Sequence, residues 1–384
     1  MSKISRRTFT GLMTASTAAL AMPSISLGAL PRVVVIGGGA GGATAARYLA
    51  KDSKGAVDVT LIEASKRYYT CFFSNLYLGG VRNYGSIGHN YYGLAVNRGV
   101  NVVHEWAVSV DNAAKKVNLG SGASVSYDKL VISPGIDIKY ESVNGYSPEA
   151  QTHIPHAWKS GTQVQLLKNK VMNMKQGGTF VMVTPPNPYR CPPGPYERVS
   201  MIAHQFKKSN PTAKIVVLDP KNKFSKQGLF MEGWQRHYPG MIEWIDADTH
   251  GGIKNVNVAK MEFETDLDTF KADAASIVPA QRAGSIAMAA GVNDGDWCPI
   301  MPASMQSKAD ENIYVLGDAS IAASMPKSGF SANSQAKVAA NHIRGSLTGS
   351  KIFGARYANT CWSLVATNDG IKVGASYKAG DEKI

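Results

Sequence analysis

The stretch RVVVIGGGAGGATAARYLA (residues 32–50) combines an apolar run, a glycine-rich turn and an alanine-rich segment. The apolar run is typical of a buried strand, and the alanine-rich segment is typical of a helix. Between them, Gly37, Gly39 and Gly42 form the pattern G-x-G-x-x-G. This pattern permits a tight turn and lets a pyrophosphate approach the N-terminus of the helix. The stretch therefore predicts a dinucleotide-binding strand–turn–helix unit.

Three later strand ends complete this predicted site. The run VDVTLIE ends at Glu63, 21 residues beyond Gly42, where an acidic residue holds a ribose hydroxyl in dinucleotide-binding folds. The stretches YDKLVISPGI (127–136) and ENIYVLGDAS (311–320) each end a buried strand in a turn. Such paired strand ends resemble the FAD-binding half of flavoproteins that have two dinucleotide-binding domains. The resemblance assigns Asp318 to the ribityl chain of FAD.

The distance between these strand ends predicts a discontinuous FAD-binding domain. Residues 31–150 and 285–330 form it, and residues 151–284 form a second α/β domain of the NAD-binding type. Residues 331–384 form a small C-terminal domain, which looks shortened and whose TCWSL-containing tail predicts short strands and turns. The fold class is thus α/β, with two Rossmann-like domains and a small C-terminal interface domain.

The loop PPNPYRCPPGPYER (185–198) occupies the place of a second glycine motif. It follows the strand-like run TFVMVT and has six prolines between positions 185 and 195. Proline has no backbone N–H to offer a pyrophosphate. Asp219 nevertheless closes the next strand, as it would in a nucleotide-binding fold. We therefore predict that the second domain keeps the fold but does not bind NAD(P)H.

The N-terminal segment SRRTFTGLMTASTAALA resembles a twin-arginine export signal. We expect residues 1–30 to be removed and the folded protein to reach the periplasm. The formal net charge is +13, which favours acidic partners or surfaces, but Lys and Arg are scattered and form no nucleic-acid-binding motif. The histidines have no metal-site spacing such as H-E-x-x-H, so no metal is predicted.

Four cysteines, Cys71, Cys191, Cys298 and Cys361, form neither C-x-x-C nor C-x-x-C-H. The chain therefore attaches no c-type haem. In an exported protein a structural disulfide is one reading for any pair of them. A cysteine on a stiff loop beside a flavin domain offers a second reading, because disulfides accept thiolate and hydrosulfide nucleophiles. Electrons from a sulfur compound would then replace those from NAD(P)H.

The chain resembles the flavoprotein subunit of flavocytochrome c sulfide dehydrogenase, within the broader class of flavoproteins similar to sulfide:quinone reductase. The resemblance covers nearly the whole mature chain. It rests on the N-terminal glycine motif and on the segments YYTCFFSN, RCPPGPYER, WCPI, NIYVLGDAS, KSGFSANSQA and NTCWSL. It implies FAD as the cofactor, sulfide as the substrate and a separate c-type cytochrome subunit as the electron acceptor.

The same resemblance implies roles for individual residues. Cys71 matches the cysteine that binds FAD covalently through a thioether, and Cys191 with Cys361 matches the redox-active disulfide. A buried thiol at Cys71 and a structural bridge between the other two are the alternatives. Glu197 is the candidate proton shuttle near the disulfide, if an apolar pocket raises its pKa; an exposed glutamate at a helix start is the alternative.

Two further residues, Lys327 and Cys298, have no single role in this scheme. Lys327 either lies near the flavin, whose reduced form favours a nearby cation, or is a surface lysine. Cys298 in WCPI has no assigned chemistry and is expected to be a buried thiol.

The predicted function is that of an FAD-dependent oxidoreductase that oxidises sulfide and passes electrons to a c-type cytochrome. A sulfide:quinone reductase-like enzyme and a flavoprotein partner of a thiosulfate-oxidising system are alternatives. A quinone reductase usually carries an amphipathic membrane-binding tail, which ASYKAGDEKI does not resemble. A non-catalytic flavoprotein would not need the three cysteines, and an NAD(P)H-dependent disulfide reductase is disfavoured by the proline-rich loop.

Overall fold

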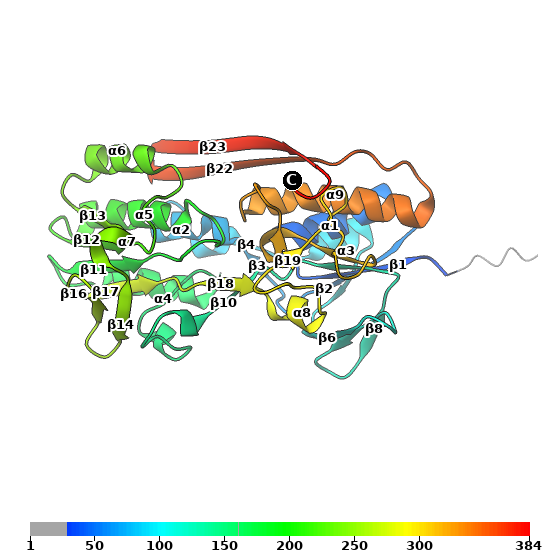
Figure 1. Ribbon diagram of the computed structural model, residues 1–384, viewed down its shortest axis with the longest axis horizontal. Helices are drawn as coiled ribbons and strands as arrows, with labels where there is room; N and C mark the ends of the chain where they lie inside the picture. Colours follow the sequence, from blue (N-terminus) through cyan, green and yellow to red (C-terminus); the bar gives the residue numbers. More distant parts are fainter. Residues whose placement is uncertain (1–28, 160) are drawn as a thin grey trace, which may run out of the picture. The chain divides into compact units, whose positions relative to one another are not determined.

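The computed structural model describes residues 29–159 and 161–384. The predicted export segment 1–30 lies, apart from its last two residues, outside the described residues. Residues 31–384 form one compact unit that contains two parallel sheets (Figure 1). The predicted α/β fold class with two Rossmann-like halves is confirmed.

The first sheet has five parallel strands in the order β20-β9-β1-β2-β5. Nearly every residue of β1 is buried, which explains the continuous apolar run from Val33 to Ile36. Strand β1 pairs on one side with β2 and on the other with β9. The strands are β1 (Arg32–Ile36), β2 (Asp58–Ile62), β5 (Asn101–Val103), β9 (Lys129–Ile132) and β20 (Ile313–Val315).

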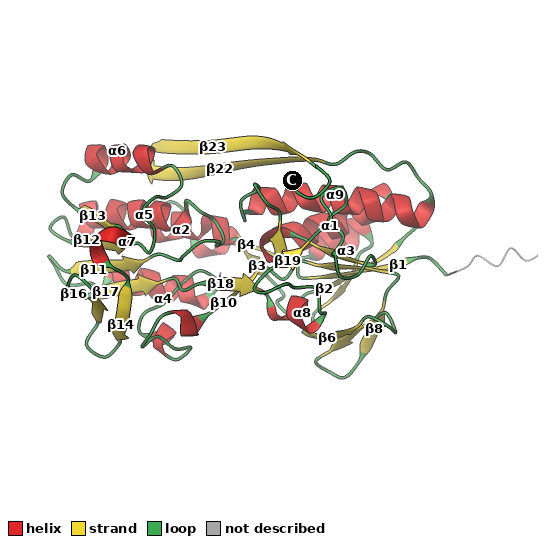
Figure 2. Ribbon diagram, in the orientation of Figure 1, coloured by secondary structure: helices red, strands yellow, loops and turns green. Residues whose placement is uncertain are grey.

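Helices α1 (Ala40–Asp52) and α9 (Gly329–Thr348) pack against each other on one face of this sheet (Figure 1). Asn333 of α9 donates a hydrogen bond to Thr44 of α1. On the opposite face, α8 (Ser285–Ala289) lies beside a small antiparallel sheet (Figure 2). That sheet consists of β6 (Ala107–Asp111), β7 (Lys116–Leu119) and β8 (Ser124–Ser126).

The second sheet has four parallel strands in the order β13-β12-β11-β17. Its β11–α5–β12 unit repeats the β1–α1–β2 arrangement of the first sheet, and α5 (Gly194–Ser209) is buried along most of its length. The helix begins three residues before Glu197, inside the proline-rich loop, since proline is tolerated in the first turn of a helix. The strands are β11 (Thr179–Val183), β12 (Lys214–Leu218), β13 (Ile242–Ile245) and β17 (Ala274–Ile277).

Two short antiparallel strands connect the two sheets: β10 (Ile136–Ile138) leads out of the first and β18 (Gln281–Ala283) leads back. Tyr146 and Ala150 pack in the apolar cluster of the second sheet. This part of the chain therefore packs with the second sheet, although the predicted boundary lies at residue 150. The predicted boundary at 330 falls at the start of α9, a helix that packs on the first sheet's α1.

The C-terminal segment differs from the sequence expectation of short strands and turns. It forms one long antiparallel hairpin of β22 (Arg356–Ala366, 11 residues) and β23 (Asp369–Lys378, 10 residues) (Figure 1). Residues of β22 alternate between buried and more exposed positions because one face of the strand packs on α5, α6 (Gln227–His237) and α9. Packing on helices from both halves of the unit thus explains the length of the hairpin.

The remaining elements are short, apart from α3 and α4, and most of them connect or flank the sheets. The helices are α2 (Ser74–Leu78), α3 (Tyr92–Arg98), α4 (Thr162–Met172), α7 (Ala247–His250) and the 3-10 turns η1 (Cys71–Phe73), η2 (Tyr84–Ile87), η3 (Tyr140–Ser142), η4 (Ala150–Thr152) and η5 (Gly317–Ala319). The strands are β3 (Tyr68–Tyr69), β4 (Gly88–His89), β14 (Ile253–Asn257), β15 (Glu262–Thr265), β16 (Thr269–Lys271), β19 (Cys298–Pro299) and β21 (Ser320–Ile321).

Candidate active site

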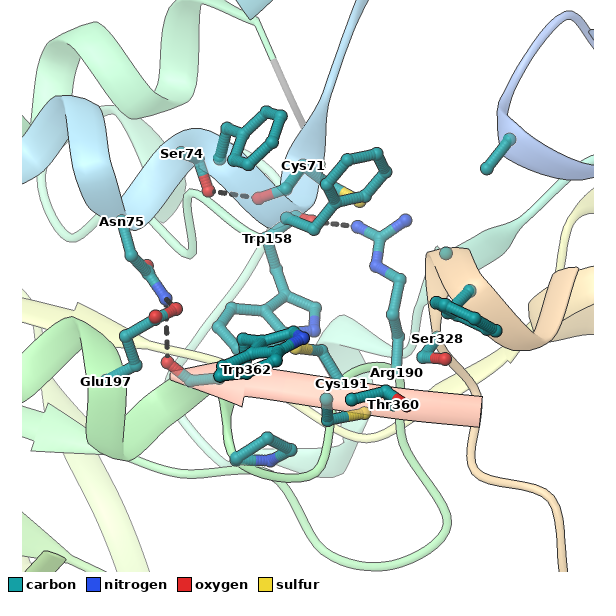
Figure 3. A pocket seen from close by; sticks show the side chains of 18 of the residues that line it. Cys71, Ser74, Asn75, Trp158, Arg190, Cys191, Glu197, Ser328, Thr360 and Trp362 are labelled. Carbon is teal, nitrogen blue, oxygen red and sulfur yellow. Dashed lines mark hydrogen bonds between the residues drawn. The ribbon is translucent and has the colours of Figure 1, made fainter. Parts of the chain in front are cut away.

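A cavity of about 550 Å³ brings together three cysteines from distant parts of the chain. Figure 3 shows two of them, Cys71 and Cys191. Cys71 belongs to η1, Cys191 to the proline-rich loop before α5, and Cys361 to β22. Glu197, on the first turn of α5, lines the same cavity. A volume of this size is typical of small-molecule and cofactor sites. The fold therefore places Cys71, Cys191 and Cys361, the three cysteines with predicted roles, around one site.

The proline-rich loop holds Cys191 by backbone hydrogen bonds. The N–H of Cys191 donates to the carbonyl oxygen of Lys327 (2.7 Å), and its own carbonyl accepts from the N–H of Gly194 (2.8 Å). Cys191 has a φ of +60°, which is uncommon for a residue with a side chain. Burial raises the pKa of its thiol, Glu197 and Cys361 add to this effect, and Arg190 opposes it.

Cys361 is buried on the inner face of β22. The Nδ2 of Asn359 donates to its Sγ (3.3 Å), and the ammonium of Lys226 donates to its carbonyl oxygen (3.2 Å). All four cysteines of the chain are free thiols in the structure. The predicted Cys191–Cys361 disulfide is thus not formed here, although both residues line the same cavity.

Glu197 is 8% exposed, so the alternative of an exposed glutamate at a helix start does not apply. One carboxylate oxygen accepts from Asn75 Nδ2 (2.9 Å), which lies beside Glu197 in Figure 3. The other accepts from the N–H of Leu364 (2.9 Å). Burial raises the pKa of this carboxyl, while the two hydrogen bonds and the nearby Lys226 oppose the rise. A buried glutamate with a raised pKa is suited to proton transfer.

The glycine loop before α1 has the geometry of a phosphate cradle. Gly37 has a φ of +94°, and a Cβ on Gly42 would lie 1.8 Å from the Gly37 carbonyl oxygen. No side chain caps the N-terminus of α1. Its first N–H groups can therefore bind an anion, as in other dinucleotide-binding folds. Glu63 lies beside the loop, where one carboxylate oxygen accepts from the N–H of Gly38 (2.7 Å).

These residues fit the adenine dinucleotide FAD. The N–H groups of the first turn of α1 would hold the pyrophosphate, and Glu63 would hold a ribose hydroxyl. Ala40 and Thr44, both on α1, also line the cavity that contains the three cysteines. The cavity therefore extends from the cradle to the sulfur atoms, as a flavin attached to that pyrophosphate requires.

Asp318 and Lys327 lie beside this cavity but are not among the described residues that line it. One carboxylate oxygen of Asp318 is buried without a hydrogen-bond partner in the described chain, and the other lies 3.8 Å from Arg190. Such an orphaned oxygen fits a ligand hydroxyl, as the predicted contact with the ribityl chain requires. Burial raises the pKa of Asp318, while Arg190 and Lys327 oppose the rise.

Lys327 is not a free surface lysine. Its ammonium donates to the carbonyl oxygens of Asp318 (2.7 Å) and Ser320 (2.8 Å) and lies 3.7 Å from the centre of the Trp297 ring. Burial lowers its pKa to about 8. Lys327 therefore fixes the turn that carries Asp318.

The second nucleotide-type site is filled by the chain itself. Asp219 ends β12 at the place of a ribose-binding acid, but it is fully buried. Its carboxylate accepts from Tyr196 Oη (2.6 Å) and Trp244 Nε1 (2.9 Å) and pairs with Lys221 (2.7 Å). Tyr196 also stacks on Phe224 with ring centres 3.6 Å apart. The carboxylate therefore has no free oxygen for a nicotinamide nucleotide.

Cys298 lies outside the cavity, on β19, and is fully buried. Burial raises the pKa of its thiol to about 12, and Lys327 opposes the rise. It has the environment of a buried structural thiol. The part of the chain that the structure describes contains no group of three His, Cys, Asp or Glu side chains placed to hold a metal ion.

Sequence reasoning missed several residues that shape the cavity. Arg198 is fully buried, donates to the carbonyl oxygens of His156 and Ala157, and lies 4.7 Å from the centre of the Trp158 ring. Arg190 extends from the proline-rich loop into the site (Figure 3). Both arginines stand inside RCPPGPYER, so this segment contained the only sequence signal for them.

Family models match three parts of the chain. Residues 164–279 match the central part of the sulfide dehydrogenase (flavocytochrome c) flavoprotein chain, and residues 354–384 match the flavin-binding part of flavocytochrome c sulfide dehydrogenase. Residues 31–175 match the pyridine nucleotide-disulfide oxidoreductases. Together these matches cover the second sheet, the C-terminal hairpin and every strand of the first sheet except β20.

Among curated relatives, the sulfide dehydrogenase flavoprotein chain of Chlorobaculum thiosulfatiphilum is 52% identical over 44 residues, which are 12% of this chain and 90% of that sequence. The mitochondrial sulfide:quinone oxidoreductase of Mus musculus is 25% identical over 186 residues, which are 48% of this chain and only 41% of the mouse enzyme.

Two solved structures share the fold. The sulfide:quinone oxidoreductase of Aquifex aeolicus has a TM-score of 0.70 at 17% identity, covering 90% of this chain and 87% of that one. The NAD-dependent persulfide reductase of A. fulgidus has a TM-score of 0.67 at 18% identity, covering 87% and 64%. The fold likeness aside, the 52% identity to the Chlorobaculum thiosulfatiphilum chain and the family models at residues 164–279 and 354–384 show that the chain belongs to the family of flavocytochrome c sulfide dehydrogenase flavoprotein chains, which are FAD-containing oxidoreductases.

Proposed function

We propose that the protein oxidises sulfide through a Cys191–Cys361 disulfide and bound FAD, and that a c-type cytochrome subunit accepts the electrons. The observation that carries this proposal is the convergence of Cys71, Cys191, Cys361 and Glu197 on one cavity that begins at the glycine cradle. A cofactor scaffold would not need three thiols and a buried acid at the same place.

In this proposal each residue of the cavity has a defined task. The disulfide accepts the nucleophile HS⁻, which is one of the reactions that open disulfides. Glu197, whose pKa is raised by burial, takes up the proton of the incoming sulfur species. FAD, when bound, supplies a two-electron acceptor that can return electrons one at a time. Asn75 and the N–H of Leu364 hold the carboxylate of Glu197 in place.

We further propose that Cys71 binds FAD covalently. Support comes from its place in the cavity wall and from the hydrogen bond by which Ser74 holds its carbonyl oxygen (2.6 Å) (Figure 3). Acid denaturation of the purified protein tests this directly. The proposal predicts that the mass of the Cys71 peptide is increased by that of FAD. Release of all FAD into the acid supernatant would show that no covalent bond is formed.

The cytochrome partner and the location are part of the same proposal. The matching family is described as the flavoprotein chain of a flavocytochrome c, and this chain has no haem-attachment motif of its own. The haem would therefore belong to another chain. The twin-arginine segment supports export to the periplasm with FAD already bound. Expression with Arg6 and Arg7 both replaced by Lys should retain the protein in the cytoplasm.

A quinone acceptor is the main alternative, because the mouse relative is a sulfide:quinone oxidoreductase. No helix in the described part of the chain is long and apolar enough to cross a membrane. Anaerobic turnover with sulfide and either cytochrome c or a short-chain quinone separates the two acceptors. Faster reduction of cytochrome c supports the proposal, and exclusive reduction of the quinone would replace it.

A further inference from the structure

A short relay of hydrogen bonds ends on the sulfur atom of Cys361. Asn359 lies two residues before Cys361 on β22 and is 3% exposed. Its Nδ2 donates to Cys361 Sγ at 3.3 Å, and its Oδ1 accepts from the hydroxyl of Ser328 at 2.6 Å. The thiol of Cys361 also lies 3.7 Å from Asn359 Oδ1, so both ends of the amide reach the sulfur. A thiolate can only accept, so it bonds to Nδ2 while Ser328 holds Oδ1.

Ser328 connects this amide to a helix. It is the N-cap of α9, and its hydroxyl oxygen accepts from the N–H of Ser331 at 3.1 Å. The hydroxyl proton of Ser328 can go to either of two acceptors. Asn359 Oδ1 lies 2.6 Å away and the hydroxyl of Ser331 lies 3.1 Å away, so the amide oxygen is the closer acceptor. The N-terminus of a 20-residue helix therefore polarises the amide in the direction that makes its Nδ2 a better donor.

The surroundings of Cys361 suit a negative charge on its sulfur. The ammonium of Lys226 donates to the Cys361 carbonyl (3.2 Å) and to the hydroxyl of Ser363 (2.8 Å), and in the described chain it forms no ion pair with a carboxylate. Lys226 is half-buried, and it lies close enough to Cys361 and Glu197 for its charge to favour an anion at either of them. Lys226 thus acts on Cys361 through the field of its charge, whereas Asn359 touches the sulfur itself.

The surroundings of Cys191 differ. No hydrogen-bond donor reaches its Sγ among residues 29–159 and 161–384. Burial and the neighbouring Glu197 raise the pKa of its thiol, and Arg190 only partly offsets them. A thiolate at Cys191 therefore lacks the support that the amide gives to Cys361.

We propose that Asn359, oriented by Ser328, stabilises Cys361 as the leaving thiolate, so that sulfide attacks Cys191. This inference rests on the proposed function, since it assumes the Cys191–Cys361 disulfide. In the step, the sulfur of HS⁻ forms a bond to Cys191 Sγ and the Cys191–Cys361 bond breaks. Its electron pair remains on Cys361, and Cys191 becomes a persulfide that first keeps the proton of HS⁻ and then passes it to Glu197. A better-stabilised leaving thiolate speeds disulfide exchange.

The test uses the purified holoprotein with its disulfide formed, as verified by intact mass. Sulfite serves as the probe because it opens disulfides in the same way and leaves a stable S-sulfonate on the attacked cysteine. After anaerobic reaction, free thiols are alkylated at once and peptides are analysed by mass spectrometry. The inference predicts the S-sulfonate on Cys191 and the alkyl group on Cys361.

Three variants separate the electrostatic role of Asn359 from a structural one. Asn359→Ala should slow the reaction with sulfite by about 10- to 100-fold, the range for loss of a hydrogen bond to a charged group. Asn359→Asp has nearly the same shape but places a carboxylate beside the sulfur, and it should move part of the S-sulfonate to Cys361. The control is Asn341→Ala, which removes a hydrogen bond from Asn341 on α9 to the Phe353 carbonyl. It should change neither the rate of the reaction with sulfite nor the position of the S-sulfonate.

Each outcome decides between the two proposals. S-sulfonate mainly on Cys361 of the wild-type protein would overturn this inference while leaving the redox disulfide intact. A distribution that is the same in the wild-type, Asn359→Ala and Asn359→Asp proteins would also overturn it. If an intact disulfide gave no adduct on either cysteine and sulfide left the flavin oxidised, both the inference and the proposed function would fail.

Discussion

The loops after β1 and β11 occupy equivalent places in the two sheets, yet they are built for different chemistry. The first has glycines, an uncapped helix N-terminus and Glu63 beside it. The second has prolines and Cys191, and its acid Asp219 is buried under Tyr196, Trp244 and Lys221. The comparison teaches that a Rossmann-like unit can keep its strands and helix while its loop loses the glycine cradle and its acid is occupied by the chain's own side chains. Under the proposed function, the loop then supplies a reactive sulfur instead.

The largest expected effect concerns the cysteine of the second loop and its partner. Under the proposed function, Cys191→Ser or Cys361→Ser removes the disulfide that sulfide attacks, so the rate of flavin reduction by sulfide should fall by about 10³-fold or more. Stopped-flow absorbance under anaerobic conditions measures this rate. Cys298→Ser, a change at a buried thiol outside the cavity, is the matched control and should keep the wild-type rate.

Replacing the two acids at the strand ends, Asp219 and Glu63, should change different properties of the protein. Asp219→Ala leaves Lys221 buried without its partner, so the free energy of unfolding should drop by about 3–5 kcal/mol. Glu63→Ala should change stability little but lower the FAD content of the purified protein. Denaturant unfolding measures the free energy of unfolding, and the flavin-to-protein absorbance ratio measures the FAD content. Equal stability losses in both variants would show that the two acids have the same structural role.

Glycines in the two loops provide a third contrast. A Cβ at Gly42 would lie 1.8 Å from the Gly37 carbonyl oxygen, so Gly42→Ala should cost about 1–3 kcal/mol and lower FAD content. A Cβ at Gly194 would lie 2.9 Å from Cys191 Sγ, so Gly194→Ala should retain FAD but slow reduction by sulfide. Gly228→Ala, with open space around its Cβ, is the control for both measurements.

The smallest expected effect is on the pH dependence of the free energy of unfolding. Burial raises the pKa of Glu197 above its ordinary value of 4.5, so the folded protein binds this proton more tightly than the unfolded chain does. The contribution of Glu197 to stability should therefore decline as pH rises from 4.5 through the raised pKa. Glu197→Gln removes this dependence.

The same variant should also alter the rate of flavin reduction. The wild-type rate should fall on the acid side of the raised pKa, because the carboxylate must be free to accept a proton. In Glu197→Gln the rate should be lower and should not show that acid limb. An unchanged pH–rate profile would exclude Glu197 as the proton acceptor.

The sequence was sufficient to predict the parts of the fold that depend on local patterns. The glycine motif with its flanking strand and helix is readable because each element has its own periodicity and turn chemistry. The hairpin of β22 and β23 was predicted only as short strands and turns. Its length depends on packing against α5, α6 and α9, which the sequence of the tail does not contain.

The candidate site was predictable for residues whose chemistry is unusual in any context. Cysteines in a proline-rich loop and an acid on the following helix stand out in a sequence. Arg198, Asn75 and Asn359 do not, because their importance comes from contacts with residues that are distant in sequence or from their orientation. Roles for the predicted site residues and for the export signal remain predictions.

The most direct test of the central claim is an anaerobic titration of the oxidised holoprotein, in parallel, with sulfide and with NADH. Flavin absorbance near its long-wavelength maximum reports the redox state. The account predicts that about one equivalent of sulfide reduces the flavin and that NADH leaves it oxidised. Reduction by NADH together with no response to sulfide would contradict it, because the proline-rich loop would then not have replaced nucleotide binding with sulfur chemistry.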